Sequence, residues 1–532
     1  MRGADLLVKT LAAAGVRKIF SLSGNQIMPV YDACIDAGIE IVHTRHEAAA
    51  VFMADAWAQL TGEVGVALVT AAPGAANAFA ALYTARQSES PVLLLTGDSS
   101  RAQDGSGAFQ ELDQVSISAP LTKLSMRCTA AATIGDDVAR GISTALSGRP
   151  GPVHLALPID VLQHDAGEKS LPDAVDYART SSAPAEDSID SLLQMLKSAE
   201  RPLVLCGASL NDTRFGDENA KLSNAIGAPV VAMESPRGLK DPSLGDLAKA
   251  VLRADFILSL GKPVDFTVGF GAQSGARWLL VDADLSEQQR ARKNLGERLV
   301  SFPLADPRAV AMALASRARG WEPKAAWRAE VGELLAARNF STEPSRTGPI
   351  VPASLCAAVQ RHIEREPETV VICDGGEFGQ WAQACTRGTH RVINGPSGAI
   401  GAGLCYAVAA KKAKPSATVF VFMGDGTIGF HLAEFETAAR ENAPFIAIIG
   451  NDQCWNAEHQ IQLRDYGPKR LIGCQLSDAR YDKVVEGLGG HGEYVRDLAE
   501  LDAALSRAVA SGKPACINVV IEGVPAPSGH SH

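Results

Sequence analysis

Short apolar runs rich in β-branched residues alternate with longer Ala-rich stretches along most of the chain. In the first 165 or so residues the runs are KIFSLSG, IEIVHT, VGVALVT, PVLLLTG and PVHLALP. Runs of this length predict buried strands, and the intervening stretches are long enough for crossover helices. A repeat of strand and helix in this order predicts a mainly parallel sheet.

The same alternation occurs twice more along the sequence. A second block contains PLVLCG, PVVAM, FILSLG and RWLLVDAD, and a third contains TVVICDGG, ATVFVFMGDG, FIAIIGND and ACINVVI. Polar segments rich in Pro and Ser separate the blocks, at residues 164–188 and around residues 339–352. We therefore predict an α/β protein with three parallel-sheet domains, spanning residues 1–165, 186–340 and 350–532.

Composition limits the kinds of binding partner and the cellular location that can be expected. The chain has 532 residues, 46% of them apolar, and a net charge of −10, without a basic stripe that would suit nucleic acid. Residues 65–83 are interrupted by Pro73, Gly74 and Asn77, which favours a strand turning into a helix over a membrane span. The ten cysteines form no CxxC pair, and the first residues lack the pattern of a signal peptide. We expect a cytoplasmic protein with neither a nucleic-acid nor a membrane partner.

Two acids follow neighbouring strands of the third block. Asp425 lies between Gly424 and Gly426, and Asp452 follows the next predicted strand, 27 positions later. One strand, helix and strand unit has this length, so both acids should meet at the same edge of the sheet. Two carboxylates suit Mg²⁺, and amides from Thr427 onward would open a helix that favours phosphate. A tight glycine turn is the alternative for the GDG alone. Together these features predict a metal-bridged diphosphate site.

The GDG motif with an acid about 27 positions later resembles the fingerprint of thiamine diphosphate enzymes. The segment TRHEAAAVFMADAWAQLTG, residues 44–62, is similar to the part of this family that bears its cofactor-activating glutamate, and VTAAPGAANA and GSGAFQE resemble neighbouring loops. The resemblance covers all three blocks and is closest to the acetolactate synthase, benzaldehyde lyase and 2-hydroxyacyl-CoA lyase branch. Most relatives have Asn where this chain has Asp452, which is still a good metal ligand but adds a negative charge.

The resemblance implies cofactor contacts at matching positions. Glu47 is expected to hydrogen-bond the aminopyrimidine ring and to promote loss of the C2 proton, from a site buried beside the AAAVF run. The Gly398 carbonyl would accept from the 4′-amino group, and Ile400 would hold the cofactor bent. Without the family, Glu47 would be a helix-surface acid, and the other two a turn and a core residue. Further implied contacts are Pro73 and Asn77 on the pyrimidine side and the Cys454 carbonyl as the third protein ligand of Mg²⁺. The amides of Gly376 and Glu377 would hold the diphosphate from the other side, with a plain turn as the alternative.

Substrate-side residues are implied by the same loops. Asn25, Gln26 and Gln110 are expected near C2 as catalytic residues beside Glu47, although hydrogen bonding within their own loops is the alternative. None of the three titrates, so the enamine formed from the C2 adduct should be captured by a second carbonyl. Trp455, Ala457 and His459 are candidates for the pocket wall, although a surface or packing position is the favoured alternative for His459. The implied activity is a carboligase or 2-hydroxyacyl lyase; the alternatives are a 2-oxo acid decarboxylase and a non-catalytic thiamine diphosphate-binding subunit.

The implied partners are small carbonyl compounds and further copies of the chain. Candidate substrates are a 2-oxo acid, a 2-hydroxy ketone or a 2-hydroxyacyl-CoA, and the sequence does not decide between them. Glu47 and Asp425 fall in different domains, which the family places around one cofactor from different subunits, so a homodimer or homotetramer is expected. FAD is expected to be absent because the middle block lacks a GMHG-like stretch. His530 and His532 are further metal candidates.

Overall fold

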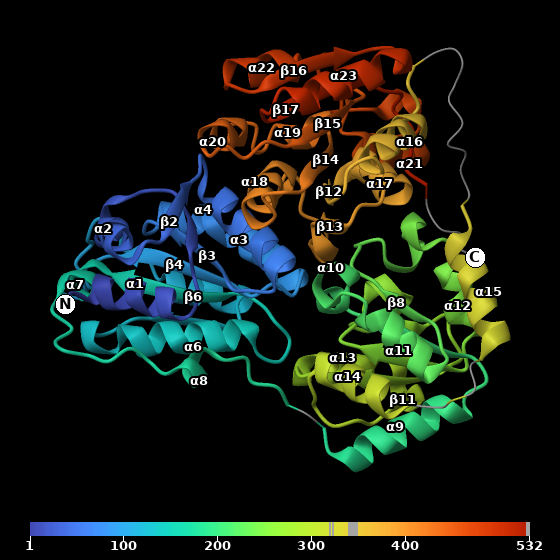
Figure 1. The fold of residues 1–532 in the computed structure, drawn as a ribbon, viewed down its shortest axis with the longest axis horizontal. Coiled ribbons are helices and arrows are strands. Elements are labelled where there is room, and N and C mark those ends of the chain that lie inside the picture. Colours follow the sequence, from blue (N-terminus) through green and yellow to red (C-terminus); the bar gives the residue numbers. More distant parts are fainter. Residues whose placement is uncertain (183, 319–320, 322–323, 339–348, 528–532) are drawn as a thin grey trace.

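The computed structural model describes residues 1–182, 184–318, 321, 324–338 and 349–527. Three α/β domains follow one another along the chain, each built on one sheet whose strands are all parallel (Figure 1). The predicted fold class is therefore confirmed. The N-terminal domain, in blue, lies against the C-terminal domain, in orange and red, and the middle domain, in green and yellow, contacts both.

The N-terminal domain has a six-stranded sheet in the order β2-β1-β3-β4-β6-β5. Its fully buried strands, β3, β4 and β6, are the most apolar runs of the block, and helices cover both faces. The strands are β1 (Lys18–Ser21), β2 (Glu40–His43), β3 (Gly65–Val69), β4 (Val92–Asp98), β5 (Leu124–Arg127) and β6 (Val153–Pro158). The helices are α1 (Gly3–Ala13), α2 (Met28–Ala37), α3 (Glu47–Thr61), α4 (Pro73–Gln87), α5 (Gln114–Ser118), α6 (Ile134–Leu146), α7 (Ile159–Gln163) and α8 (Ala174–Tyr177).

The C-terminal domain repeats this connectivity, with the order β13-β12-β14-β15-β17-β16. The strands are β12 (Thr369–Cys373), β13 (His390–Ile393), β14 (Thr418–Gly424), β15 (Ile446–Asn451), β16 (His491–Val495) and β17 (Ala515–Val520). The helices are α16 (Pro352–Ile363), α17 (Gly376–Cys385), α18 (Gly403–Ala413), α19 (Asp425–Ile428), α20 (Glu434–Arg440), α21 (Asn456–Tyr466), α22 (Tyr481–Gly487) and α23 (Leu498–Ala510).

The middle domain has a five-stranded sheet in the order β11-β10-β9-β7-β8. The strands are β7 (Pro202–Cys206), β8 (Val230–Ala232), β9 (Phe256–Leu260), β10 (Arg277–Val281) and β11 (Leu299–Val300). The helices are α9 (Glu186–Ser198), α10 (Asp212–Phe215), α11 (Glu218–Ile226), α12 (Leu247–Arg253), α13 (Leu285–Leu295), α14 (Pro307–Arg317) and α15 (Ala325–Ala336).

Helices α3 and α18 join the outer two domains into one shared apolar core. Both are rich in alanine, whose short side chains let the two backbones approach closely. At their contact the Tyr406 hydroxyl donates to the buried Asp55 carboxylate at 2.8 Å, and the Gln59 amide donates to its other oxygen, also at 2.8 Å. Buried polar groups need such partners, so this bond fixes how the two helices pack.

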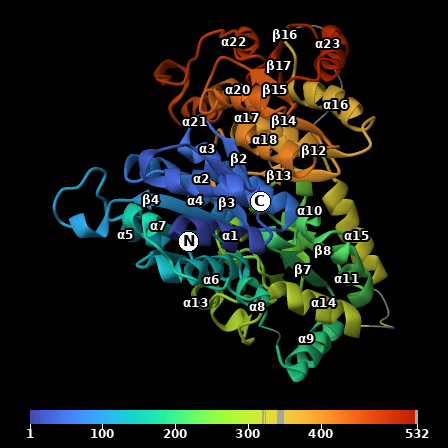
Figure 2. The same ribbon diagram turned by 60° about the vertical axis from the view of Figure 1, so that its left-hand side comes forward.

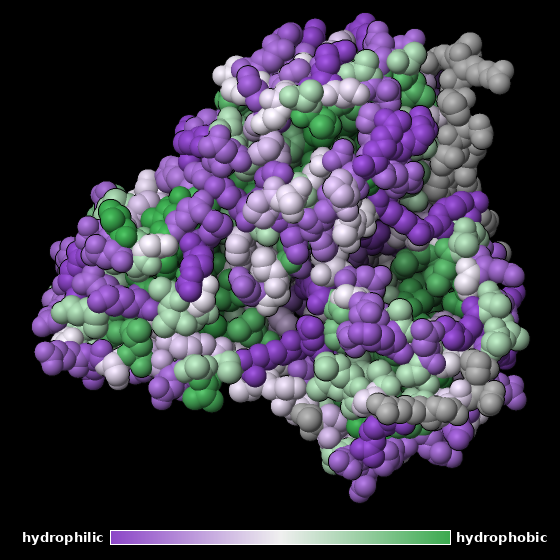
Figure 3. Space-filling model, in the orientation of Figure 1, coloured by the Kyte–Doolittle hydropathy of each residue, from purple (hydrophilic) through white to green (hydrophobic). Residues whose placement is uncertain are grey.

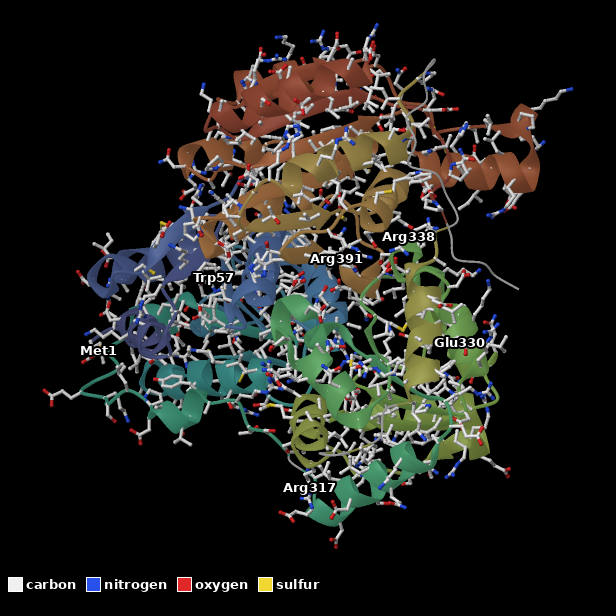
Figure 4. The ribbon with its side chains drawn as sticks, turned by 45° about the vertical axis from the view of Figure 1, so that its right-hand side comes forward. Met1, Trp57, Arg317, Glu330, Arg338 and Arg391 are labelled. Carbon is white, nitrogen blue, oxygen red and sulfur yellow. The ribbon has the colours of Figure 1, made fainter. Side chains whose placement is uncertain are left out.

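Buried ion pairs attach the middle domain to its neighbours. Arg391 on the edge strand β13, labelled at this junction in Figure 4, donates to Glu234 at 2.9 Å. On the other side, Arg149 of the N-terminal domain bonds Glu89 at 2.8 Å and Asp282 of the middle domain at 2.9 Å. The Glu89 carboxylate also accepts from the backbone of Ser209, directly beyond the end of β7. These N-terminal-domain side chains therefore lie at the point between β7 and β9 where an open sheet would receive a ligand, and they line a cavity of only about 60 Å³ there.

The face of the molecule in Figure 3 is largely hydrophilic, and residues 65–83 fold within the N-terminal domain. Within the described part of the chain, no helix has the length and apolar character needed to cross a membrane. Residues 65–83 form strand β3 and most of helix α4, as predicted. Hydrophilic side chains cover most of the face drawn in Figure 3, with smaller hydrophobic areas between them. The ten cysteines are all free thiols, and most are buried.

Candidate functional site

Loops at the carboxyl edge of the C-terminal sheet enclose a cavity of about 200 Å³. They follow β12, β13, β14 and β15, which are neighbours in the sheet. This is the crevice in which open α/β sheets bind ligands. Ten of the cofactor and metal residues predicted in the described part of this domain line the cavity: Gly376, Glu377, Gly398, Ile400, Gly424, Asp425, Gly426, Thr427, Asp452 and Cys454.

The two predicted metal acids lie together in this cavity. Asp425 is the first residue of α19 and Asp452 follows β15, and their carboxyl groups interact. Burial raises the pKa of Asp425 to about 8, with the charge of Asp452 as the second cause, and burial raises the pKa of Asp452 to about 6. The buried Oδ2 of Asp425 has no hydrogen-bond donor within the described structure. A divalent cation between the two groups would supply the missing partner and offset their repulsion.

The oxygen atoms of these residues suit a hard cation that also binds ligands from outside the protein, such as phosphate and water. The described residues contain no cluster of three or more His, Cys, Asp or Glu side chains able to hold a metal. Two carboxylates and the Cys454 carbonyl would leave positions for phosphate oxygens and water, the arrangement that Mg²⁺ favours. His530 and His532 lie outside the described residues.

A buried acid that the sequence analysis missed connects two walls of the cavity. Asp374 follows β12, accepts from the Asn394 amide at 2.6 Å and accepts from the Gly401 backbone at 2.9 Å. These bonds tie the loop after β12 to the loop that carries Gly398 and Ile400. An acid directly after a strand was the available signal, since Asp374 and Asp425 occupy equivalent places at the ends of adjacent strands.

Two close contacts shape the apolar side of the cavity. A Cβ atom on Gly375 would lie 2.4 Å from Cγ2 of Ile400, so glycine is required for this packing. A Cβ atom on Gly426 would similarly lie 2.7 Å from the Trp455 ring. Trp455 and Ala457 line the cavity as expected, whereas His459 is not among the residues that line it. Ile400 and Trp455 thus give an apolar lining to the cavity that also holds the two acids.

A second set of predicted residues lies at the carboxyl edge of the N-terminal sheet. Glu47 is the first residue of α3, and the His46 ring caps this helix by accepting from the Ala48 backbone at 3.1 Å. Asn77 on α4, which Pro73 begins, donates to the Glu47 carboxylate at 3.0 Å. The structure therefore brings together the predicted activating glutamate and Asn77, one of the two residues predicted on the pyrimidine side. Glu47 itself is half-buried and not buried as expected, whereas the alanines directly after it are buried.

The three substrate-side amides differ in their surroundings. Asn25 is exposed, whereas Gln26 is buried and accepts from the Thr70 hydroxyl at 2.6 Å. Gln110 is half-buried in the long connection between β4 and α5 and has a φ of 60°. Gln26 is thus held by a side chain of another loop, which differs from the alternative of hydrogen bonding within its own loop. Asn25 and Gln110 keep their side chains available.

Among the described residues, the N-terminal candidates do not line the cavity at the C-terminal edge. Neither Glu47 nor Asn25, Gln26 and Gln110 is among the residues that line the C-terminal cavity. Its volume of about 200 Å³ is also below the roughly 300–1,000 Å³ of sites that enclose a drug-sized ligand. A single chain therefore presents two partial sites.

The chain matches two domain families, and it is similar over nearly its whole length to known enzymes. Residues 1–117 match the thiamine pyrophosphate enzyme N-terminal TPP binding domain, and residues 374–519 match the C-terminal TPP binding domain of the same enzymes. The chain is 31% identical to a probable acetolactate synthase of Mycobacterium bovis, over 98% of this chain and 96% of that protein. It is 28% identical to 2-hydroxyacyl-CoA lyase 2 of Danio rerio, over 98% and 91%, and of Homo sapiens, over 98% and 90%.

Proposed function

This chain belongs to the thiamine pyrophosphate enzyme family, and from that premise we propose that it makes or cleaves a carbon–carbon bond next to a carbonyl group. The activity is that of an acetolactate synthase-like carboligase or a 2-hydroxyacyl lyase, because both kinds of relative match almost the whole chain. The observation that carries the proposal is the C-terminal cavity, where four adjacent strand ends gather two acids, glycine-rich loops and an apolar wall.

The cavity residues would hold thiamine diphosphate through a magnesium ion. Asp425, Asp452 and the Cys454 carbonyl would ligate Mg²⁺, while the amides of Gly376, Glu377, Gly426 and Thr427 would face the diphosphate oxygens. The Glu377 side chain is held by the Ala526 backbone and lies 3.6 Å from Arg237, which fixes the backbone on which these amides depend. When bound, this cofactor supplies a carbon nucleophile and an electron sink.

The protein's own contribution is to position groups and move protons. Glu47, oriented by Asn77, would share a proton with the aminopyrimidine ring through its carboxylate. The Gly398 carbonyl would accept a hydrogen bond from the 4′-amino group of the cofactor, and the Ile400 side chain would pack against the cofactor. Asn25, Gln26 and Gln110 would orient the carbonyl substrate without acting as acids. This lack of an acid favours joining of two carbonyl compounds over release of an aldehyde.

Assembly of the site requires a second copy of the chain. Glu47 and Asp425 belong to different partial sites of one chain, and a homodimer would let each cavity receive the N-terminal edge of the partner. Pairing of dimers would give a homotetramer. Light scattering on active enzyme tests this point, and an active species with the monomer mass of 55.8 kDa would contradict it.

A product screen with the purified holoenzyme tests the proposed reaction. Isotope-labelled 2-oxo acids, 2-hydroxy ketones and 2-hydroxyacyl-CoAs are each supplied as donor, with and without excess acceptor aldehyde. We expect one donor class to be turned over, and with a 2-oxo acid or 2-hydroxy ketone donor we expect more 2-hydroxy ketone than free labelled aldehyde. Almost exclusive release of aldehyde from 2-oxo acids, even with abundant acceptor, would instead identify a 2-oxo acid decarboxylase.

A further inference from the structure

The connection between β4 and α5, residues 99–113, extends from the body of the N-terminal domain (Figure 2). It carries Gln110, which the proposed function places beside the carbonyl substrate. Its ends are attached to the domain by polar contacts: Arg127 pairs with Asp104 at 2.7 Å and with Asp98 at 2.6 Å. At the other end, Asp113 caps α5 by accepting from the Ser116 backbone at 3.0 Å. The middle of the connection needs a separate explanation.

One carboxylate organises this middle part. Glu111 accepts from the backbone N–H groups of Gly105 at 2.5 Å, Gly107 at 2.9 Å and Ala108 at 3.0 Å. Gly105 and Gly107 have φ values of 75° and 74°, which residues with a Cβ rarely adopt, so glycine lets these amides turn towards one point. Successive amides that converge in this way form an anion-binding concavity. Here the anion is a side chain of the same loop, and these bonds lower the pKa of Glu111.

The residues next to Glu111 are held in an unusual arrangement. Gln110 adopts a left-handed backbone with a φ of 60°, which is uncommon for a residue other than glycine. Phe109 beside it is 72% exposed, so apolar packing within the chain does not hold this ring in place. A backbone of this kind persists when its surroundings enforce it. In this exposed segment, the backbone bond from the Glu111 N–H to the Ala108 carbonyl, at 3.0 Å, closes the turn around Phe109 and Gln110. The bonds to the Glu111 carboxylate then hold this turn against residues 105–108.

We propose that Glu111 is a positioning residue for the substrate side of the reaction. Its carboxylate closes the turn at residues 105–111 and so presents Gln110 and Phe109 to the carbonyl substrate in one conformation. The inference rests on the proposed function, which places Gln110 beside that substrate. It adds a residue that touches neither cofactor nor substrate and that acts through the shape of its loop.

Two variants and a matched control separate this role from a general effect on folding. Glu111→Ala removes both acceptor oxygens, and Glu111→Gln keeps one of them, so its behaviour should lie between wild type and Glu111→Ala. Glu333→Gln is the control, because Glu333 is an exposed glutamate on α15 of the middle domain. Since Glu111 lies in an exposed loop, the melting temperature of each variant should stay within about 2 °C of wild type.

Amide hydrogen exchange of the holoenzyme gives a readout that does not depend on activity. In Glu111→Ala the peptide covering residues 104–112 should exchange faster than in wild type, and in Glu333→Gln it should not. Unchanged exchange in Glu111→Ala would show that the carboxylate does not hold the loop and would overturn the proposal.

Steady-state kinetics with the substrate identified by the product screen give the second readout. We expect kcat/KM of Glu111→Ala to fall about 10- to 100-fold, as for a misplacement of about 1 Å, while the Kd for thiamine diphosphate is unchanged. Faster exchange with wild-type kinetics would refute the positioning role. If wild type itself neither joins nor cleaves the tested carbonyl compounds, the proposed function fails instead, and the exchange result still decides whether Glu111 closes the loop.

Discussion

Lowering the pH from 7 to 5 should destabilise the N-terminal domain through one buried histidine. His154 on β6 is fully buried, and burial lowers its pKa to about 3. One ring nitrogen pairs with the Thr96 hydroxyl at 2.8 Å, and the other meets the hydroxyls of Ser118 at 2.7 Å and Ser125 at 3.0 Å. The Phe79 ring packs edge-on at 5.5 Å. None of these neighbours carries a charge, so the site holds the neutral ring.

The size of the effect follows from the two protonation equilibria. A histidine in the unfolded chain has a pKa of about 6.5, whereas the folded one has a pKa of about 3. Between these values the unfolded state binds a proton that the folded state does not. The stability contributed by the neutral ring is therefore complete above about pH 6.5 and is lost as the pH falls towards 3. Relative to pH 7, the loss at pH 5 amounts to about 2 kcal/mol in the free energy of unfolding.

Urea-dependent amide exchange on peptides from β4 and β6 measures this free energy locally. His154→Gln should be less stable than wild type at pH 7, because it leaves a cavity, but it should lose about 2 kcal/mol less between pH 7 and pH 5. His164→Gln changes an exposed histidine just after α7 and serves as the control. If His154→Gln and wild type lose the same free energy over this range, another group carries the dependence and the reasoning is wrong.

Three further predictions concern the cofactor. Glu47→Gln should keep the fold while proton exchange at C2 of bound thiamine diphosphate, followed by NMR, falls by about 10²- to 10⁴-fold; a wild-type rate would contradict this. Calorimetry should show that Asp425→Ala abolishes magnesium-dependent cofactor binding and that Asp452→Asn retains it, since an amide oxygen still ligates; equal losses would mean that the second ligand is misassigned. FAD should not raise the melting temperature, because Glu89 and Arg149 leave a cavity of only about 60 Å³ at the ligand point of the middle sheet; a concentration-dependent rise would refute this.

The sequence predicted the interior strands and missed most of the edge strands, for a physical reason. Buried strands such as β3 and β14 are apolar on both faces, so they appear as continuous runs. Strands β5, β13 and β16 each pair with one neighbour and are largely half-buried. They therefore contain polar residues, such as the HRVI of β13, and lack the pattern that identifies a buried strand.

The residues of the candidate site also form two groups, those that local spacing could predict and those that it could not. Residues that directly follow a strand, such as Asp425 and Asp452, could be placed from local spacing because strand ends meet at one edge. Contacts between distant segments could not be placed. Gln26 is held by Thr70, 44 positions away, and Asp374 meets Asn394 from another strand end. Nor could the sequence show that Glu47 is half-buried in one chain, since a helical pattern does not show which neighbouring segment covers the first residue of the helix.

The repeated connectivity of the outer domains supports the proposal that the site is divided between chains. Both sheets have the same strand order, and in each the predicted residues follow the same four adjacent strands. Helices α3 and α18 hold equivalent places, each after the second strand of its domain, and they pack against one another within the chain. The chain therefore carries two related carboxyl edges, one with Glu47 and one with Asp425. Since the cavity beside Asp425 receives no N-terminal candidate residue from its own chain, a second copy related by a twofold axis would complete two identical sites at once.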